Sequence, residues 1–507
     1  MMSIATRVGT FAQRGSLVQQ MMMIQKRLYE ADVQLNTEKK SQDYAGISGD
    51  SFRLVTLEND KTRTQRFIQT NTIANTRLES MAAATDAVDK RIRTMRSELQ
   101  ALTNQTFSNP LNQGQLDNLE DIQVRAFAAM QDVADYLNTK LDGRYLFAGG
   151  RTSEPPVDLA FTTLNSFQAT YDGANITFPV TRAANVPDIA LSNNEHGGLT
   201  FAAGPPSTIT ATTAASVNGI QPGTLIRLDD PDIGDTQFTV TANDGAGVLT
   251  ITPSLTGPQA VTLNADAADA TLQTVSYYGG DSLVIEHRVS DTRTIDLGLN
   301  AKAAGFEKAI RALGILAQGG LDASDTTTAA GTTGTLTFAN GTSSVTAATA
   351  GSFDGLAIGS SITFPGTALN NAQTFTITGN DGTTLTLDPP PNNEAAVASD
   401  AVSNNLGRLD YALRLLGDAI EHDSSFTQEQ SGDLEGVART IGMHQVTLNR
   451  AIKEDQGYEV FLETRQTDIE NVNLIEVGVR LQDEANALQM SFQAYARISQ
   501  LSLQDYL

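Results

Sequence analysis

The sequence predicts an α+β protein in which helices at the two ends of the chain form an elongated α-helical coiled-coil bundle that carries an inserted β-rich region. Apolar residues recur at alternating spacings of four and three near both ends, which is the heptad pattern of a coiled coil. The central region is rich in Thr, Ala, Asn and Gly and contains short alternating runs, which are typical of β-strands. An internal repeat in this region indicates duplicated β-modules.

Residues 1–150 are expected to form an N-terminal helical core. Its first helix carries a narrow seam of six apolar positions: Leu17, Met21, Ile24, Leu28, Ala31 and Leu35. Because a helix is stabilised mainly by packing its apolar stripe, this seam requires a partner helix. A break near Gly46 and Gly49 precedes a long second helix, which ends near Pro110 and keeps the heptad register at Leu78, Met81, Val88, Ile92, Met95, Leu99 and Leu102. A third helix is expected from about Leu116 to Leu141, before Asp142-Gly143.

Residues 406–507 are expected to form a C-terminal helical core that pairs with residues 1–150. One helix should end near His422, and the final helix should begin near Leu434, with residues 459–507 helical from end to end. Its seam lies at Leu474, Leu481, Ala485, Leu488, Phe492 and Tyr495. This seam is as narrow as the N-terminal one, so each is the natural partner of the other.

Residues 151–405 are expected to form the β-rich outer insertion, with two modules at about 206–263 and 332–391. The run from Ile209 to Ile220 returns as Val345 to Leu356, and later segments of the two modules also correspond. Each module carries an Asn-Asp-Gly triplet between strand-like runs, which predicts a hairpin turn. Two copies are too few for a solenoid, and a helix is expected between the modules at about 304–317.

Composition excludes several classes of function. The 507 residues have a net charge of −24, which repels nucleic-acid backbones and anionic membranes. No cysteine is present, so disulfide scaffolds, Cys-ligated metals and Cys nucleophiles are excluded. No run approaches the roughly 20 apolar residues that span a bilayer. No signal-peptide core follows a basic N-terminal segment, so any export is expected to occur without a cleaved signal.

The sequence offers no catalytic, cofactor-binding or metal site. The four histidines are far apart, and packing roles are favoured for them over metal ligation. The acidic stretch 229–235 could hold calcium through carboxylate oxygens, but it lacks the spacing of a calcium loop, so a solvated loop is favoured. No nucleophile elbow, HExxH pair or phosphate-binding loop is present, and we therefore predict that the protein is not an enzyme.

Two segments resemble the flagellin family. Residues 138–149, Asn-Thr-Lys-Leu-Asp-Gly-Arg-Tyr-Leu-Phe-Ala-Gly, are similar to the end of that family's N-terminal helical core. Residues 487–498, Ala-Leu-Gln-Met-Ser-Phe-Gln-Ala-Tyr-Ala-Arg-Ile, and the closing 501–507 resemble its hook-associated proteins more than its filament flagellins. The resemblance covers both helical ends, about half of the chain.

The resemblance implies a structural subunit of the bacterial flagellum, assembled as a ring of copies at the hook-filament junction. Its implied partners are copies of itself, a neighbouring hook-associated protein, flagellin and a cytoplasmic export chaperone. It implies an extracellular location and no cofactor. Together with the seams, it predicts the helix and subunit packing residues Leu17, Met21, Ile24, Leu28, Leu35, Leu474, Leu481, Leu488, Phe492, Tyr495 and Ile498.

Two other interpretations stay open at the level of sequence. The chain could be a filament flagellin, which copy number and the ability to form long filaments alone would distinguish. It could also be a β-domain adhesin on a helical stalk, in which case residues 151–405 should bind a glycan or a host surface. Neither the number of copies in a ring nor the role of the duplicated modules follows from the sequence.

Overall fold

The computed structural model describes residues 2–173, 177–187, 198–220, 223–229, 236–265, 271–322, 326–328, 334–349, 351–353, 356, 358–380, 382–423 and 429–504. These residues fall into two compact units. Unit 1 comprises residues 1–73 and 448–507, and unit 2 comprises residues 74–447. The predicted divisions at residues 150 and 405 do not coincide with these units, because helices from both sides of the β-rich region share one core in unit 2.

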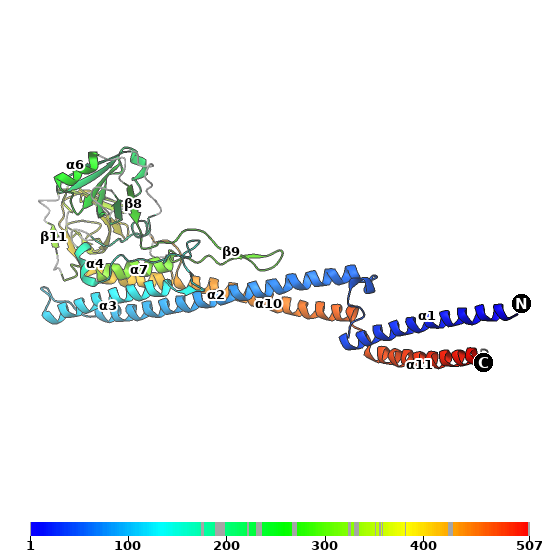
Figure 1. Ribbon diagram of the computed structural model, residues 1–507. Coiled ribbons are helices and arrows are strands. Elements are labelled where there is room, and N and C mark those ends of the chain that lie inside the picture. The colour runs from blue at the N-terminus through cyan, green and yellow to red at the C-terminus, as the bar shows by residue number, and fades with distance from the viewer. Residues whose placement is uncertain are drawn as a thin grey trace. The chain divides into compact units, whose positions relative to one another are not determined.

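Unit 1 is helical and contains both ends of the chain. It holds α1 (Met2–Thr37), the short 3-10 helix η1 (Tyr44–Ile47) and α11 (Leu474–Gln504), together with the first part of α2 (Ser51–Thr103) and the last part of α10 (Leu434–Glu470). Helices α1 and α11 lie side by side, with the N- and C-terminal ends at the same end of the pair (Figure 1). They are therefore antiparallel. The parts of α2 and α10 in this unit are joined by an ion pair between Lys61 and Glu463 at 2.7 Å.

The prediction of one continuous helix over residues 459–507 was wrong at residues 471–473, where α10 ends and α11 begins. The Asn473 side chain accepts a hydrogen bond from the Ile475 N–H at 3.1 Å, and the Asn473 carbonyl accepts one from the Val477 N–H. Asn473 therefore caps the N-terminus of α11. The uninterrupted apolar pattern on both sides conceals this break in the sequence.

Unit 2 has a helical layer and two antiparallel sheets (Figure 1). The helical layer contains the second part of α2, the first part of α10, and α3 (Gln113–Leu137), α4 (Leu164–Thr170), α5 (Arg182–Asn185), α7 (Ala304–Ala317) and α9 (Gly407–Ile420). The predicted seam of α2 is confirmed, since its seven apolar residues from Leu78 to Leu102 are at most 6% exposed. Thr85, the polar residue within this seam, is buried and donates its hydroxyl to the Met81 carbonyl at 2.9 Å.

Helix α7 is the centre of unit 2. The helix expected at 304–317 is confirmed, and every residue from Gly305 to Ala317 is buried. Helices α3, α4, α5 and α9 all contact it. A helix that is buried on all sides must pair any charge it carries, and α7 carries three, on Glu307, Lys308 and Arg311.

Helix α3 ends four residues before the predicted end at Leu141. After Leu137 the chain forms a two-residue hairpin, with β1 (Lys140–Leu141) paired to β2 (Arg144–Tyr145). Asp142 and Gly143 both have positive φ, 51° and 75°, as a type I′ turn requires. The Asp-Gly pair was thus correctly identified as a stop, but it belongs to a hairpin and not to the end of the helix.

Each predicted β-module belongs to one sheet, and the strand ladders are antiparallel throughout the described residues. The first sheet has the order β3-β4-β7-β6-β5-β8, with strands β3 (Leu199–Ala202), β4 (Ser207–Ala211), β5 (Leu225–Asp229), β6 (Thr236–Asn243), β7 (Val248–Thr252) and β8 (Thr271–Val275). The 3-10 helix η2 (Ala214–Ser216) follows β4, and α6 (Gly257–Ala265) packs against β3. Alternate residues of these strands point into a core that includes Phe201, Phe238 and Leu249.

The second sheet has the order β11-β18-β14-β15-β16-β13-β12-β17. Its strands are β11 (Thr326–Thr328), β12 (Leu336–Ala339), β13 (Ser344–Ala347), β14 (Ser361–Thr363), β15 (Thr374–Asn380), β16 (Thr384–Asp388), β17 (Glu394–Val397) and β18 (Ala401–Asn404). Its core includes Phe338, Phe364 and Phe375. A separate hairpin, β9 (Glu286–Arg288) with β10 (Thr294–Asp296), lies between the modules in the sequence.

The two modules repeat each other in detail. In both, the first strand of the repeat pairs with the last, β4 with β7 and β13 with β16. The longest strand of each module carries a β-bulge, between Val240 and Ala242 in β6 and between Ile377 and Gly379 in β15. The Asn243 amide donates to the carbonyls of Val217 and Ile220 at 2.8 and 2.9 Å. Asn380 donates to Phe353 and Leu356 at the same two distances. The predicted internal repeat is therefore a structural repeat.

These two asparagines should contribute to the stability of the two β-modules. We expect Asn243→Ala and Asn380→Ala each to lower the free energy of unfolding by about 1–3 kcal/mol, because two carbonyls lose their donor. Chemical denaturation of the single variants measures this loss. Thr337→Ala, on the exposed side of β12, is the control and should change stability little. Asparagine variants as stable as the control would contradict the assigned role.

Candidate assembly surface

The least exposed residues of α1 form the predicted N-terminal seam. Ile24 and Ala31 are buried, and Leu17, Met21, Leu28 and Leu35 are half-buried, whereas most other described positions of α1 are exposed. Helix α11 is the element that contacts α1. Arg27 and Glu484 join the two helices through an ion pair of 2.8 Å. The structure therefore places this seam against the C-terminal helix.

On α11, the face turned to α1 differs in part from the predicted one. Val477 is buried, and Leu481, Glu484, Leu488, Ser491 and Ile498 are half-buried at four-three or seven-residue spacings, with half-buried Gly478, Ala487 and Ala494 beside them. Leu481, Leu488 and Ile498 were predicted for this face, whereas Tyr495, which was also predicted, is 37% exposed. Leu474 and Phe492 were assigned to the seam, but they lie at its edge with 43% and 48% exposure, and Ala485 is exposed as well. The error arose because polar Glu484 and small Ser491 occupy seam positions, while larger apolar residues flank them.

Both helices keep a second apolar row that is exposed outside this seam, which we call the outer row. On α1 it consists of Val18, Met22 and Tyr29, with exposures of 40%, 55% and 70%. On α11 it consists of Ile475, Val479 and Met490, with exposures of 80%, 57% and 67%. Spacings of four, seven and eleven residues place each set on one helical face. Sequence reasoning missed the outer row, although its heptad spacing was a readable signal.

The turn between α1 and α2 is tied to the turn between α10 and α11. The Lys40 N–H donates to the Glu470 carbonyl at 2.7 Å, and the Val472 N–H donates to the Glu38 carbonyl at 3.0 Å. The Lys40 ammonium donates to the carbonyls of Asp468 and Ile469 at 3.0 and 2.7 Å. It therefore satisfies the last carbonyls of α10, where a positive charge also complements the helix dipole.

Glu470 adds a carboxylate to the same connection. Its side chain lies 3.0 Å from the Lys39 ammonium. Burial by itself would raise the pKa of Glu470, but hydrogen bonds from Gln466 and Lys39 outweigh burial and lower it. The carboxylate thus contributes stability above its ordinary pKa, and this contribution is lost as the pH falls through the lowered value. The two connections, between α1 and α2 and between α10 and α11, are therefore fixed to one another by charge and by backbone pairing.

The other sites considered from the sequence are the four histidines and the acidic stretch 229–235. Residues 230–235 of the acidic stretch, together with His196, lie outside the described residues. His287 lies on β9, and burial lowers its pKa. His422 contacts Asp418, and His444 lies on α10. Within the described ranges, no three His, Asp or Glu side chains gather in a way that could hold a metal ion.

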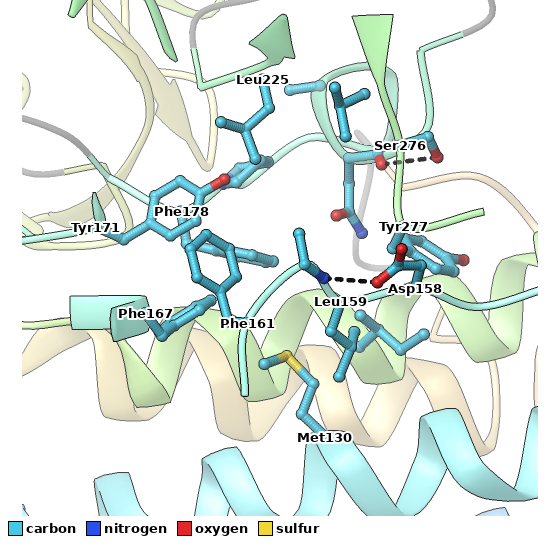
Figure 2. Close-up of a pocket in the computed structure, with 16 residues that line it drawn as sticks. Met130, Asp158, Leu159, Phe161, Phe167, Tyr171, Phe178, Leu225, Ser276 and Tyr277 are labelled. Atoms are coloured by element: carbon cyan, nitrogen blue, oxygen red, sulfur yellow. Dashed lines mark hydrogen bonds between the residues drawn. The ribbon is translucent and has the colours of Figure 1, made fainter. Parts of the chain in front are cut away.

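A pocket in unit 2 is lined by aromatic rings and is too small for a ligand. Phe161, Phe167, Tyr171 and Phe178 converge above Met130 of α3 (Figure 2). Three of these rings, Phe167, Tyr171 and Phe178, lie 5.1–5.4 Å apart by their centroids, as in packed aromatic clusters. The cavity measures about 40 Å³, whereas ligand pockets usually exceed about 300 Å³. It is part of the core that joins α3 and α4 to the first sheet.

No helix within the described part of the chain is long and apolar enough to cross a membrane. Comparison with protein-family models gives no match, and comparison with curated proteins gives none either.

Among solved structures, the chain is similar to the flagellar hook associated protein-3 of Legionella pneumophila, with 10% identity, a TM-score of 0.26, and 88% of this chain and 99% of that chain covered. It is similar to the flagellar junction protein FlgL of the same organism, with 10% identity, a TM-score of 0.25, and 89% and 99% covered. It is also similar to the flagellar hook junction protein FlgK of Burkholderia pseudomallei, with 12% identity, a TM-score of 0.13, and 90% and 97% covered. With TM-scores this low, the function proposed below depends on the helical ends and their sequence.

Proposed function

We propose that this protein is a structural, non-enzymatic subunit of the bacterial flagellum that assembles at the hook-filament junction through its two helical ends. The observation that carries the proposal is the antiparallel pairing of α1 with α11, with an apolar outer row left exposed on both helices. Exposed apolar rows of this kind cause proteins to aggregate or to bind neighbouring molecules. The resemblance of residues 138–149 and 487–507 to the flagellin family supports a flagellum as the assembly in which they are covered.

The outer row is suited to contacts between copies. An α-helical pair with an inner seam and an outer apolar row can add further helices, as in a bundle or a tube. A ring of copies would cover the row and place neighbouring hook-associated protein and flagellin above and below it. Before export, a cytoplasmic chaperone would have to cover the same surface. The location would be extracellular, and export would occur without a cleaved signal peptide.

The location along the organelle tests the proposal. Electron microscopy of isolated flagella that carry the tagged protein should show label confined to a short band where the hook meets the filament. Label along the whole filament would establish a filament flagellin instead. Label outside the flagellum, with binding of residues 151–405 to a glycan or host surface, would establish an adhesin.

The outer row should be required for assembly but not for folding. We expect Val479→Glu and Met490→Glu to leave helical content and unfolding temperature unchanged, because both side chains are exposed. In cells the same variants should fail to form the junction, because the charge would be buried between copies. Ala485→Glu, an exposed change on the same helix at a heptad position that neither row uses, is the control and should assemble normally. Normal junctions in all three variants would contradict a role for the outer row.

A further inference from the structure

A polar cavity of about 220 Å³ lies in unit 2, between the second β-module and the helical layer. Thr378 of β15 and Asp388 of β16 line it on the side of the sheet, and Tyr411 of α9 lines it on the side of the helices. Residues 180–183 and 429–430 complete its wall. The cavity is separate from the helical ends and plays no part in the function proposed above.

Two buried polar groups in the wall are poorly satisfied. Thr378 is 8% exposed, and its hydroxyl has no hydrogen-bond partner. Asp388 is 4% exposed, and its carboxylate is paired with Arg414 at the long distance of 3.4 Å. Burial raises the pKa of Asp388 in spite of that cation. Buried polar groups usually have partners, so the unpaired Thr378 hydroxyl, beside a carboxylate with one long ion pair, indicates a place where a ligand supplies the missing partner.

The internal repeat provides a comparison within the same chain. Thr241 and Thr378 occupy equivalent bulges, where a strand turns one extra side chain out of register. In the first module the Thr241 hydroxyl donates to the Thr250 carbonyl at 3.3 Å. In the second module the equivalent hydroxyl is unpaired, and Asp388 stands where the first module has Thr252. At the two positions that face the cavity, the second module therefore differs from the first in the hydrogen bonding of the threonine and in the residue type at 388.

The charges around the cavity balance. Glu429 forms two hydrogen bonds with Arg311, at 2.9 and 2.5 Å, and Arg311 also pairs with Glu307 at 2.9 Å. Arg182 lies 3.8 Å from Glu307, and Arg414 pairs with Asp388. Of these groups, Asp388, Glu429 and Arg182 line the cavity, and each lies near an opposite charge. An ion entering the cavity would gain no net attraction, whereas a neutral ligand with many hydrogen-bonding groups would meet both donors and acceptors.

We propose that this cavity binds an uncharged polyhydroxyl compound of the size of one sugar ring. Hydroxyl groups of such a ligand would donate to the carboxylates of Asp388 and Glu429 and accept from the guanidinium of Arg182. One of them would pair with the Thr378 hydroxyl. The volume is below the range of about 300–1,000 Å³ for drug-sized ligands, so it admits a monosaccharide or a linear polyol and excludes an oligosaccharide.

Ligand-observed NMR on the intact chain tests the proposal, with D-glucose, D-galactose, D-mannose and sorbitol as probes. At least one should bind with a Kd in the millimolar range or below, and inorganic phosphate and glutamate should bind more weakly than that probe. Asp388→Asn, which keeps the size of the side chain but replaces one acceptor oxygen, should weaken binding about tenfold. No binding of any neutral probe up to about 50 mM, or tighter binding of phosphate or glutamate, would overturn the proposal.

A matched pair of valine variants separates binding from folding. Thr378→Val removes the unpaired hydroxyl, so it should abolish binding while the unfolding temperature without ligand stays the same or rises. Thr241→Val makes the same change at the equivalent bulge of the first module, where the hydroxyl is bonded, and should leave binding unchanged. Equal binding by the parent chain and Thr378→Val would show that the probe does not pair with the Thr378 hydroxyl, and it would overturn the assignment of this cavity as the binding site.

Discussion

We expect that removal of residues 480–507 will abolish assembly and leave both β-modules folded. The deletion takes away most of α11, and with it the surface that buries Ile24 and Ala31 of α1. A lone helix with an unburied seam is marginal in water, so α1 should also lose much of its helical structure. Circular dichroism should show a loss of helix, while denaturation of unit 2 keeps the midpoint of the parent chain. Cells carrying the truncated chain should be non-motile.

A single charge in the seam between α1 and α11 should also weaken assembly. Leu488 is half-buried in the isolated chain, so Leu488→Asp should weaken the α1/α11 pair and should become more damaging once neighbouring copies cover the helices. Ala485→Asp introduces the same charge at an exposed position of α11 outside both rows and is the control. Normal motility of Leu488→Asp or of the truncated chain would show that this pair is not the assembly element.

The sequence predicted the elements whose apolar pattern is periodic over several turns. The seam of α2 is buried as expected, because a stripe repeated over many residues leaves one way to pack a helix, and the helix at 304–317 is present as predicted. The break at Asn473 and the hairpin at Asp142-Gly143 escaped because each depends on one or two residues. A cap or a turn gives a local signal, which a continuing apolar pattern on either side outweighs.

The two rows of the candidate surface show a different limit of sequence analysis. Val18, Met22 and Tyr29 repeat with the same period as Leu17, Met21 and Leu28, so periodicity alone does not decide which row faces the partner helix. On α11, Glu484 and Ser491 take seam positions that composition would assign to the surface. Only the exposures in the structure separate the inner seam from the outer row. The bulges at Thr241 and Thr378 likewise became visible only through strand register.

The buried charges of α7 could not be predicted, because their partners are distant in the sequence. Arg311 pairs with Glu429, and Lys308 pairs with Asp418 at 2.5 Å, with both of the latter side chains at most 1% exposed. In the sequence these residues resemble an ordinary solvated helix face. In the structure the Lys308 ammonium also donates to the Gly432 carbonyl at 3.0 Å, which holds the segment before α10 against the core.

Replacing Lys308 with methionine should destabilise unit 2 by about 3–5 kcal/mol, because the Asp418 carboxylate would remain buried without a cation. That carboxylate would keep only the Asp423 N–H, at 2.6 Å, and its contact with His422, at 2.9 Å. The double variant Lys308→Met/Asp418→Asn removes the uncompensated charge and should recover part of the loss. Chemical denaturation of both variants measures the two changes.

Lys90→Met provides the matched control for this substitution. Lys90 pairs with Asp86 at 2.6 Å, almost the same distance as the buried pair, but its side chain is 73% exposed. Water screens this pair, so its removal should leave the unfolding midpoint unchanged. Burial, and not the length of the ion pair, would then account for the difference between the two methionine variants. If Lys308→Met were as stable as Lys90→Met, or the double variant no better than the single one, the charges of α7 would not stabilise the core as the structure indicates.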